Sequence, residues 1–225
     1  GHLKRLELTD ESVSDIPFSV DVELGLGPQT RVDQRVETGP VRVRVIQTPR
    51  QSPDGSTLVF SALGSLYRMA LTPGATPERI ETGDLPVYQP SWSPDGTSIV
   101  YVSWTATDGG QLWEMPATGG TPRQLTQLPA YYSNPVYSPD GSQIAVMRAS
   151  QTDRLNAQNE IWGTLPTDLL LVSVETGETR HIFSLSGIRE PQFDPDGTHI
   201  RFRAPDGVKS VAVTGDAEPE PLINI

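Results

Sequence analysis

The chain has 225 residues, contains 20 glycines and 21 prolines, and carries a formal net charge of −11. This charge excludes a general electrostatic grip on nucleic acid, which needs clustered Lys and Arg, and no apolar run is long enough to cross a membrane. The absence of cysteine excludes disulfides and thiolate metal sites, so we expect a turn-rich globular chain.

The N-terminal stretch is predicted to form a two-stranded hairpin over residues 3–20. Leu3 to Thr9 matches Leu66 to Thr72 at Leu, Arg, Leu and Thr, with a constant offset of 63 residues. Residues 21–40 are irregular and punctuated by Gly and Pro, so we expect a connector there. Gly1-His2 resembles the remnant of a cleaved purification tag, so we expect the natural chain to extend further on that side.

A four-residue turn motif recurs from residue 41 onward. It reads Ser-Pro-Asp-Gly at positions 52, 93 and 138 and Asp-Pro-Asp-Gly at position 194, so that the steps are 41, 45 and 56 residues. Proline presets φ for the second turn position, aspartate hydrogen-bonds nearby backbone N–H groups, and glycine accepts a positive φ. No second acid lies at the spacing of a calcium loop. The residues with this structural turn role are Asp54, Gly55, Asp95, Gly96, Asp140, Gly141, Asp196 and Gly197.

The residues after each turn predict the rest of a four-stranded unit. The third and fifth residues after each motif glycine are apolar, which is typical of a half-buried strand, and a second hairpin with a Gly turn follows. Propeller blades repeat every ~40–45 residues. The predicted fold is therefore an all-β propeller of four-stranded antiparallel blades, about four and a half in number. The predicted parts are an outer half blade at 3–20, a connector at 21–40, and blades at 41–84, 85–128, 129–185 with an insertion at 149–164, and 186–225.

The half blade has no inner strands of its own. Blade edges that are left open are association hazards. We therefore expect either a partial propeller, whose ends are completed by the remaining blades or by a second copy of the chain, or an unusually closed one, whose ends close on themselves.

The repeat resembles the TolB-type, WD-like propeller repeat. The resemblance rests on the Ser-Pro-Asp-Gly turn, the alternating strand after it, Leu112-Trp113-Glu114-Met115, and the stretch from Gly119 to Thr126. It implies the propeller fold and, as one alternative, a protein-interaction module of the bacterial cell envelope. The same resemblance implies a periplasmic or secreted location.

A narrower set of residues is similar to the propeller region of secreted bacterial metal-dependent amidohydrolases. This set comprises Asp15 to Val20, Thr38 to Arg42, Gln51 to Gly55, Phe60 to Gly64, and Glu160-Ile161-Trp162 in the insertion. The resemblance implies a non-catalytic module that positions substrate or docks a domain within a larger exported hydrolase. The catalytic, metal-bearing β/α barrel of such a parent would lie C-terminal to this chain.

The sequence carries no catalytic constellation of its own. An amidohydrolase metal site needs clustered His with an acid, whereas the three histidines, His2, His181 and His199, fall on separate predicted elements. There is no Gly-x-Ser-x-Gly elbow and no phosphate-binding loop. We expect no metal, no cofactor and no catalysis by this segment. The remaining alternative is a propeller with its own active site on the variable-loop face.

A binding site is expected at the blade ends opposite the repeated turns. The second-to-third strand loops and the links between blades vary there, and function usually lies on variable loops. The polar insertion lacks an apolar stripe, so it is expected to be a solvated loop, or else a lid, a domain contact or a ligand-gripping segment. The candidate binding residues on this variable-loop face are Trp104, Tyr131, Tyr132, Arg148, Asp153, Arg154, Arg189 and Glu190.

Overall fold

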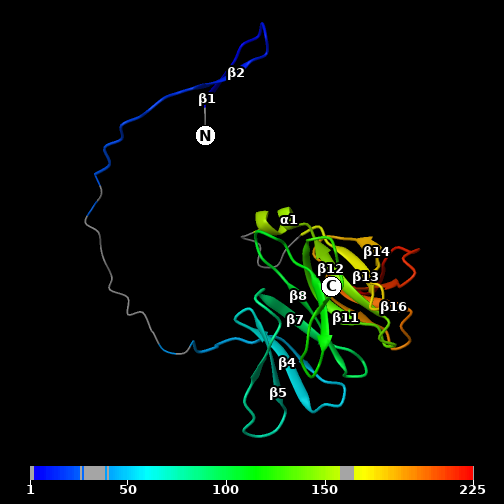
Figure 1. The fold of residues 1–225 in the computed structure, drawn as a ribbon. Coiled ribbons are helices and arrows are strands. Elements are labelled where there is room, and N and C mark those ends of the chain that lie inside the picture. The colour runs from blue at the N-terminus through cyan, green and yellow to red at the C-terminus, as the bar shows by residue number, and fades with distance from the viewer. Residues whose placement is uncertain (1–2, 26, 28–38, 40, 158–164, 225) are drawn as a thin grey trace. The chain divides into compact units, whose positions relative to one another are not determined.

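The computed structural model describes residues 3–25, 27, 39, 41–157 and 165–224, which divide into two units, residues 1–41 and 42–225 (Figure 1). Of the residues to which the sequence gives a meaning, Glu160-Ile161-Trp162 of the insertion, Thr38, Pro40 and His2 lie outside the described residues.

The first unit contains a single hairpin. Strand β1 (Leu3–Leu6) pairs antiparallel with β2 (Val13–Ile16), and Leu3 lies opposite Ile16. Every side chain of the two strands is exposed. An isolated two-stranded hairpin has marginal stability in water because it buries little apolar surface.

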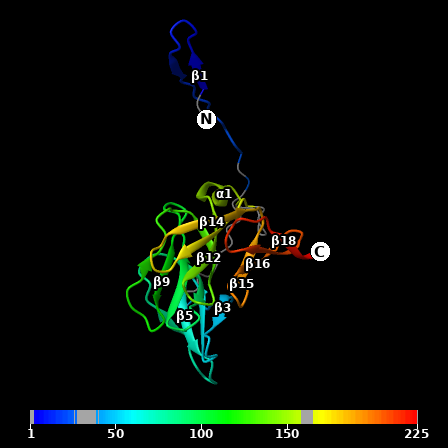
Figure 2. The same ribbon diagram turned by 90° about the vertical axis from the view of Figure 1, so that its right-hand side faces the viewer.

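The second unit confirms the predicted fold class, because it consists of four four-stranded antiparallel blades (Figures 1 and 2). Blade 1 holds β3 (Gln47–Gln51), β4 (Thr57–Ala62), β5 (Ser65–Ala70) and β6 (Glu78–Ile80), and blade 2 holds β7 (Val87–Trp92), β8 (Ser98–Ser103), β9 (Leu112–Pro116) and β10 (Arg123–Gln124). Blade 3 holds β11 (Tyr131–Tyr137), β12 (Gln143–Ala149), β13 (Asp168–Ser173) and β14 (Thr179–Ser184), and blade 4 holds β15 (Arg189–Phe193), β16 (His199–Ala204), β17 (Gly207–Ala212) and β18 (Glu220–Asn224). In each blade the four strands form a meander, with neighbours in sequence paired to one another.

The repeated turn joins the first and second strands of each blade through its own hydrogen bonds. In blade 2, the Ser93 hydroxyl donates to Asp95 at 2.6 Å and accepts from the Ser98 N–H at 2.9 Å. The Asp95 carboxylate also accepts from the backbone N–H of Thr97 at 3.0 Å. Gly96 has φ +72°, a value that costs glycine no steric clash. The hydroxyl and carboxylate of the turn therefore have hydrogen-bond partners within the turn itself.

These hydrogen bonds favour the charged form of the turn aspartates. The Ser93 hydroxyl, followed by the N–H and hydroxyl of Thr97, lowers the pKa of Asp95 to about 2. In blade 1, the Ser52 hydroxyl and the N–H and hydroxyl of Ser56 lower the pKa of Asp54 to about 2. A carboxyl whose pKa is lower in the folded than in the unfolded chain stabilises the fold above the unfolded value, which is about 4. That contribution is lost as the pH falls through the folded value.

We predict that the Ser93→Ala variant loses less stability than the unaltered chain between pH 4 and pH 2, because without the hydroxyl the pKa of Asp95 lies closer to its unfolded value. Urea unfolding at the two pH values measures the difference. Thr118→Ala, an exposed substitution in a different turn, is the control. Equal pH dependence in the two variants would contradict the role given to the serine.

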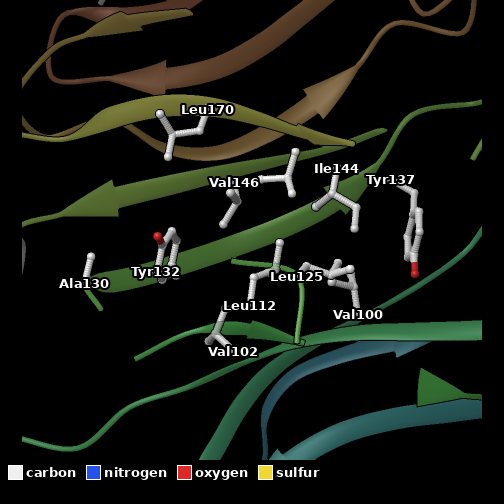
Figure 3. Packing of buried hydrophobic residues seen from close by; sticks show 11 residues of the cluster. Val100, Val102, Leu112, Leu125, Ala130, Tyr132, Tyr137, Ile144, Val146 and Leu170 are labelled. Atoms are coloured by element: carbon white, nitrogen blue, oxygen red, sulfur yellow. The ribbon is translucent and has the colours of Figure 1, made fainter. Parts of the chain in front are cut away.

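Blades 2 and 3 bury side chains on both faces of their sheets. From blade 2 onward the third and fifth residues after the motif glycine face the preceding blade, and in blades 1 to 3 the fourth and sixth are buried on the other face. Between blades 2 and 3, Val100 and Val102 of β8 form one buried cluster with Ile144 and Val146 of β12 (Figure 3). Similar clusters join blade 1 to blade 2 and blade 3 to blade 4. The second strands of blades 2 and 3, β8 and β12, are therefore apolar along both faces.

Blade 4 departs from this pattern on the face turned away from blade 3. Ile200 and Phe202 of β16 are buried in the cluster shared with blade 3, whereas the alternating positions hold Arg201 and Arg203, which are exposed. In blades 1 to 3 the equivalent residues, all buried, are Val59, Ser61, Val100, Val102, Ala145 and Met147. The outer face of blade 4 is therefore charged where the other blades pack against a neighbour.

We predict that Leu66→Ala costs about 2–5 kcal/mol of unfolding free energy, because Leu66 is fully buried between blades 1 and 2. Leu3 occupies the equivalent place in the N-terminal hairpin, since Leu3 pairs with Ile16 as Leu66 pairs with Ile80. It is 56% exposed, so Leu3→Ala is the matched control and should cost less than about 0.5 kcal/mol. Urea unfolding compares them, and similar costs would show that the hairpin is buried in solution.

Candidate functional site

Two aromatic side chains meet at the variable-loop face between blades 2 and 3. Trp104 follows the end of β8, and Tyr131 opens β11. Their ring centroids lie 5.1 Å apart and their planes stand at 87° to each other. Edge-to-face pairs of this kind are favourable because the positive edge of one ring meets the negative face of the other. The pair gives this end of the blades two nearly perpendicular aromatic walls.

A backbone contact at Gly110 holds the two loops in this position. Gly110 donates to the Ala130 carbonyl at 2.9 Å, and the Ala130 N–H donates back to Gly110 at 3.1 Å. A Cβ at Gly110 would clash with the carbonyl oxygen of Ser103 and would lie 3.1 Å from that of Ala130. Glycine therefore lets the loop fold back against the end of β8, and the bonds with Ala130 join this loop to the start of β11.

The insertion contributes a short helix, α1 (Gln151–Asn156), where the sequence predicts a loop or contact segment without regular structure. Ser150 caps it, because its hydroxyl accepts from the Asp153 N–H at 3.0 Å and donates to the Asp153 carboxylate at 2.6 Å. The Gln151 side chain contacts blade 2, because its amide donates to the carbonyl of Ala106, in the loop after β8, at 2.8 Å. The helix is thus formed by local capping and docked by one amide side chain.

Arg154 of α1 lies over the face of Tyr131. Its guanidinium carbon is 5.0 Å from the ring centroid, which is the distance of a cation–π contact. Trp104, Tyr131 and Arg154 therefore form one cluster, hereafter the aromatic–arginine cluster, built from three segments of the chain. Aromatic residues and arginine are the types enriched at protein interfaces.

Two other candidate residues have structural contacts in blade 3: Tyr132 packs in the interior, and Arg148 belongs to an ion-pair network. Tyr132 is buried, its hydroxyl donates to the Leu128 carbonyl at 2.9 Å, and burial raises its pKa. Arg148 pairs with Asp168 at 2.7 Å. Burial pushes the pKa of Asp168 up, but the Ser184 hydroxyl and Arg148 outweigh burial and hold the pKa below its usual range.

The same network brings a serine, a histidine and an aspartate together without the order of a hydrolytic triad. Ser184 donates to Asp168 at 2.6 Å, and His181 Nε2 lies 2.9 Å from the Ser184 hydroxyl oxygen. In a triad the carboxylate orients the histidine, and the histidine receives the serine proton. Here the carboxylate receives that hydrogen bond itself, so His181 is not placed as the base for Ser184.

The last two candidates lie apart from the aromatic–arginine cluster. Arg189 and Glu190 are on β15, the first strand of blade 4, and Glu190 pairs with Arg203 at 3.6 Å. The candidate set is therefore divided: Trp104, Tyr131 and Arg154 meet, Asp153 caps the helix that carries Arg154, and the others occupy different parts of blades 3 and 4.

A second set of residues was not singled out by the sequence reasoning, apart from Glu190. The first strand of each blade carries a β-bulge, at which one non-glycine residue has a positive φ and precedes a proline. These residues are Thr48 (+45°), Gln89 (+53°), Asn134 (+52°) and Glu190 (+55°). Positive φ is uncommon for such residues, and bulges re-aim side chains. The Gln89 side chain accepts from the Asn134 N–H at 2.6 Å and so joins blades 2 and 3. The signal available in the sequence is the extra proline three residues before each turn motif.

Metal ligation and membrane spanning find no support in the described residues. Within ranges 3–25, 41–157 and 165–224, no three His, Asp or Glu side chains converge as a metal site would require. His181 lies in blade 3 and His199 in blade 4. In the same part of the chain, no helix has the length and apolar character needed to span a membrane.

Comparison with known proteins places this architecture in a family. Residues 33–163, more than half of the chain, match the TolB beta propeller domain. The chain belongs to the TolB β-propeller family. The TolB-type resemblance of the repeat is thereby confirmed.

Relatives of this TolB-type propeller are longer proteins. The uncharacterized peptidase YuxL of Bacillus subtilis is 31% identical over 139 residues, which cover 51% of this chain and 21% of YuxL. The Tol-Pal system protein TolB of Francisella tularensis is 41% identical over 63 residues, 28% of this chain and 14% of TolB. A solved TolB-like protein from Agrobacterium tumefaciens superimposes with a TM-score of 0.65 and 25% identity, over 80% of this chain and 62% of that one. The chain thus spans less than two thirds of each relative.

We predict that Ser150→Ala loosens α1, because it removes the side-chain acceptor of the Asp153 N–H and a cap of this kind contributes about 1 kcal/mol. Amide hydrogen exchange over residues 151–156 should become faster while exchange in β12 is unchanged. Thr152→Ala, an exposed position in the same helix, is the control. If both substitutions had the same effect, the cap would not be what holds the helix.

Proposed function

We propose that this TolB-type propeller is a non-catalytic module that binds a polypeptide partner through its variable-loop face. The observation that carries the proposal is the aromatic–arginine cluster, in which Trp104, Tyr131 and Arg154 from three segments meet on one face. The few residues that dominate the binding energy of an interface are enriched in Trp, Tyr and Arg. The opposite blade ends satisfy their polar groups within the repeated turns, which leaves them less to offer a partner.

The family relationship supports an interaction role. One relative carries the name Tol-Pal system protein TolB, which is consistent with a module that acts through contacts with other proteins. We propose a periplasmic or secreted location for the same reason, and we propose that the segment itself works without a metal or other cofactor.

A second candidate is the same kind of module within a larger hydrolase, where it would position substrate or dock the catalytic domain. The observation that favours it is the match to the peptidase YuxL, of which the aligned region covers only 21%. In that relative, the propeller region is one part of a longer chain. Attachment to an amidohydrolase-type barrel is a finer proposal that rests on the resemblance at Asp15 to Val20, Gln51 to Gly55 and Phe60 to Gly64.

Site-specific photo-cross-linking tests the interaction role. A photoreactive residue replaces Thr107, which is exposed in the loop after β8, and the control variant carries it at Thr118, which is exposed in the turn after β9 at the opposite end of the blade. We expect one defined protein to be cross-linked in cells from position 107 and not from position 118. The cross-link should disappear when Trp104→Ala is added.

Two outcomes would overturn the proposal. The first is equal cross-linking from both positions, or a cross-link that survives the loss of Trp104. The second is hydrolytic turnover by the isolated chain, which would favour an active site on the variable-loop face.

A further inference from the structure

The guanidinium of Arg154 contacts the ring of Tyr131 without a balancing carboxylate among the described residues. Arg154 is only partly buried, and among the described residues its guanidinium has no carboxylate partner. By contrast, Arg148 nearby is held by Asp168 at 2.7 Å. The only interaction that the described structure gives the Arg154 cation is the face of Tyr131, at 5.0 Å.

The loops that carry the two aromatic rings have more contacts to hold them than the helix that carries Arg154. Trp104 and Tyr131 stand at 87° to each other, and the backbone bonds between Gly110 and Ala130 fix the loops that carry them. Arg154, on the other hand, belongs to a helix of six residues. A helix this short has little stability of its own. The two aromatic rings are thus positioned by backbone bonds between loops, whereas the cation over Tyr131 is carried by a short helix that has no buried residue and is held by its Ser150 cap and the Gln151 side chain.

We propose that Arg154 occupies a cation-binding site on the face of this chain that binds the partner. The ligand of that site is an arginine or lysine side chain of the bound polypeptide, which replaces Arg154 on the ring of Tyr131. This inference rests on the proposed interaction role and adds the chemistry of the partner to it. Perpendicular aromatic walls are a setting in which proteins recognise ammonium and guanidinium groups, because the ring faces are negative. The net charge of −11 favours the approach of a cationic segment.

The geometry requires Arg154 to compete with the ligand. A protein whose site is filled by its own side chain binds with an affinity reduced by the fraction of molecules in which the site is free. Removing the guanidinium should therefore tighten binding, which is the reverse of what loss of an ordinary contact residue does. That opposite sign separates a competing cation from a residue that contacts the partner directly.

The test uses the whole 225-residue chain and a capped Gly-Arg-Gly tripeptide as the probe, with the neutral citrulline analogue as the matched ligand. Titration is followed by NMR at the indole of Trp104. We expect Arg154→Met to bind the arginine peptide about tenfold more tightly than the unaltered chain, since a cation–π contact of this kind corresponds to a few-fold to tenfold change in population. The citrulline peptide should bind weakly to both proteins.

Variants at Tyr131 provide the second measurement. In the Arg154→Met background, Tyr131→Phe keeps an aromatic face and should retain binding, whereas Tyr131→Leu should abolish it. Arg180→Met, on β14 of blade 3, removes a cation elsewhere and should leave binding unchanged. Thermal unfolding of each variant shows that the fold is intact.

Equal affinity of Arg154→Met and the unaltered chain, or equal binding of the arginine and citrulline peptides, would overturn the inference. Its failure is distinguishable from failure of the interaction role. If Thr107 cross-links a defined partner but the peptide affinities do not respond to Arg154, only the cation site is wrong. If Thr107 captures nothing while Arg154→Met binds the arginine peptide, the cation site stands and the assigned protein partner does not.

Discussion

The structure depends on the burial of apolar side chains between neighbouring blades. A four-stranded sheet cannot shield its own faces, so the second strand of a blade presents apolar residues to each blade that packs against it. Val100 and Ile144 meet in this way between blades 2 and 3. This requirement explains the continuous apolar run of β8, which packs against a blade on each side. It also explains why β16 can carry exposed arginines on the face that is turned away from blade 3.

The repeated turns make this burial possible by setting where each strand begins. Because side chains alternate from face to face, a shift of one residue would exchange the two faces of the strand. The hydrogen bonds of Ser93 and Asp95 hold the chain at the start of β8 and so keep Val100 directed toward blade 3. A turn used in this way has its polar groups occupied, and the other ends of the blades are left free to vary.

At those other ends, three segments that are distant in sequence form the aromatic–arginine cluster. The loop after β8 supplies Trp104, the start of β11 supplies Tyr131, and the insertion supplies Arg154 through a capped helix. Separate interactions hold these parts. The backbone bonds between Gly110 and Ala130 hold the loops of the aromatic pair, and the Gln151 side chain holds the helix. The blades hold the two aromatic rings, and the short helix of the insertion carries the charge.

The sequence by itself determined the blades, because turn chemistry and strand alternation are local and repeat along the chain. It identified the turn at Asp95 and the end of the blades where loops vary. Only the tertiary structure decided which residues meet there, since contact between Trp104 and Tyr131 depends on how two loops dock and not on their spacing in sequence. It also separated Glu190 from that cluster, because Glu190 lies on β15 of blade 4 and pairs with Arg203. The positive φ of the residue before each proline of the first strands likewise became visible only in the structure.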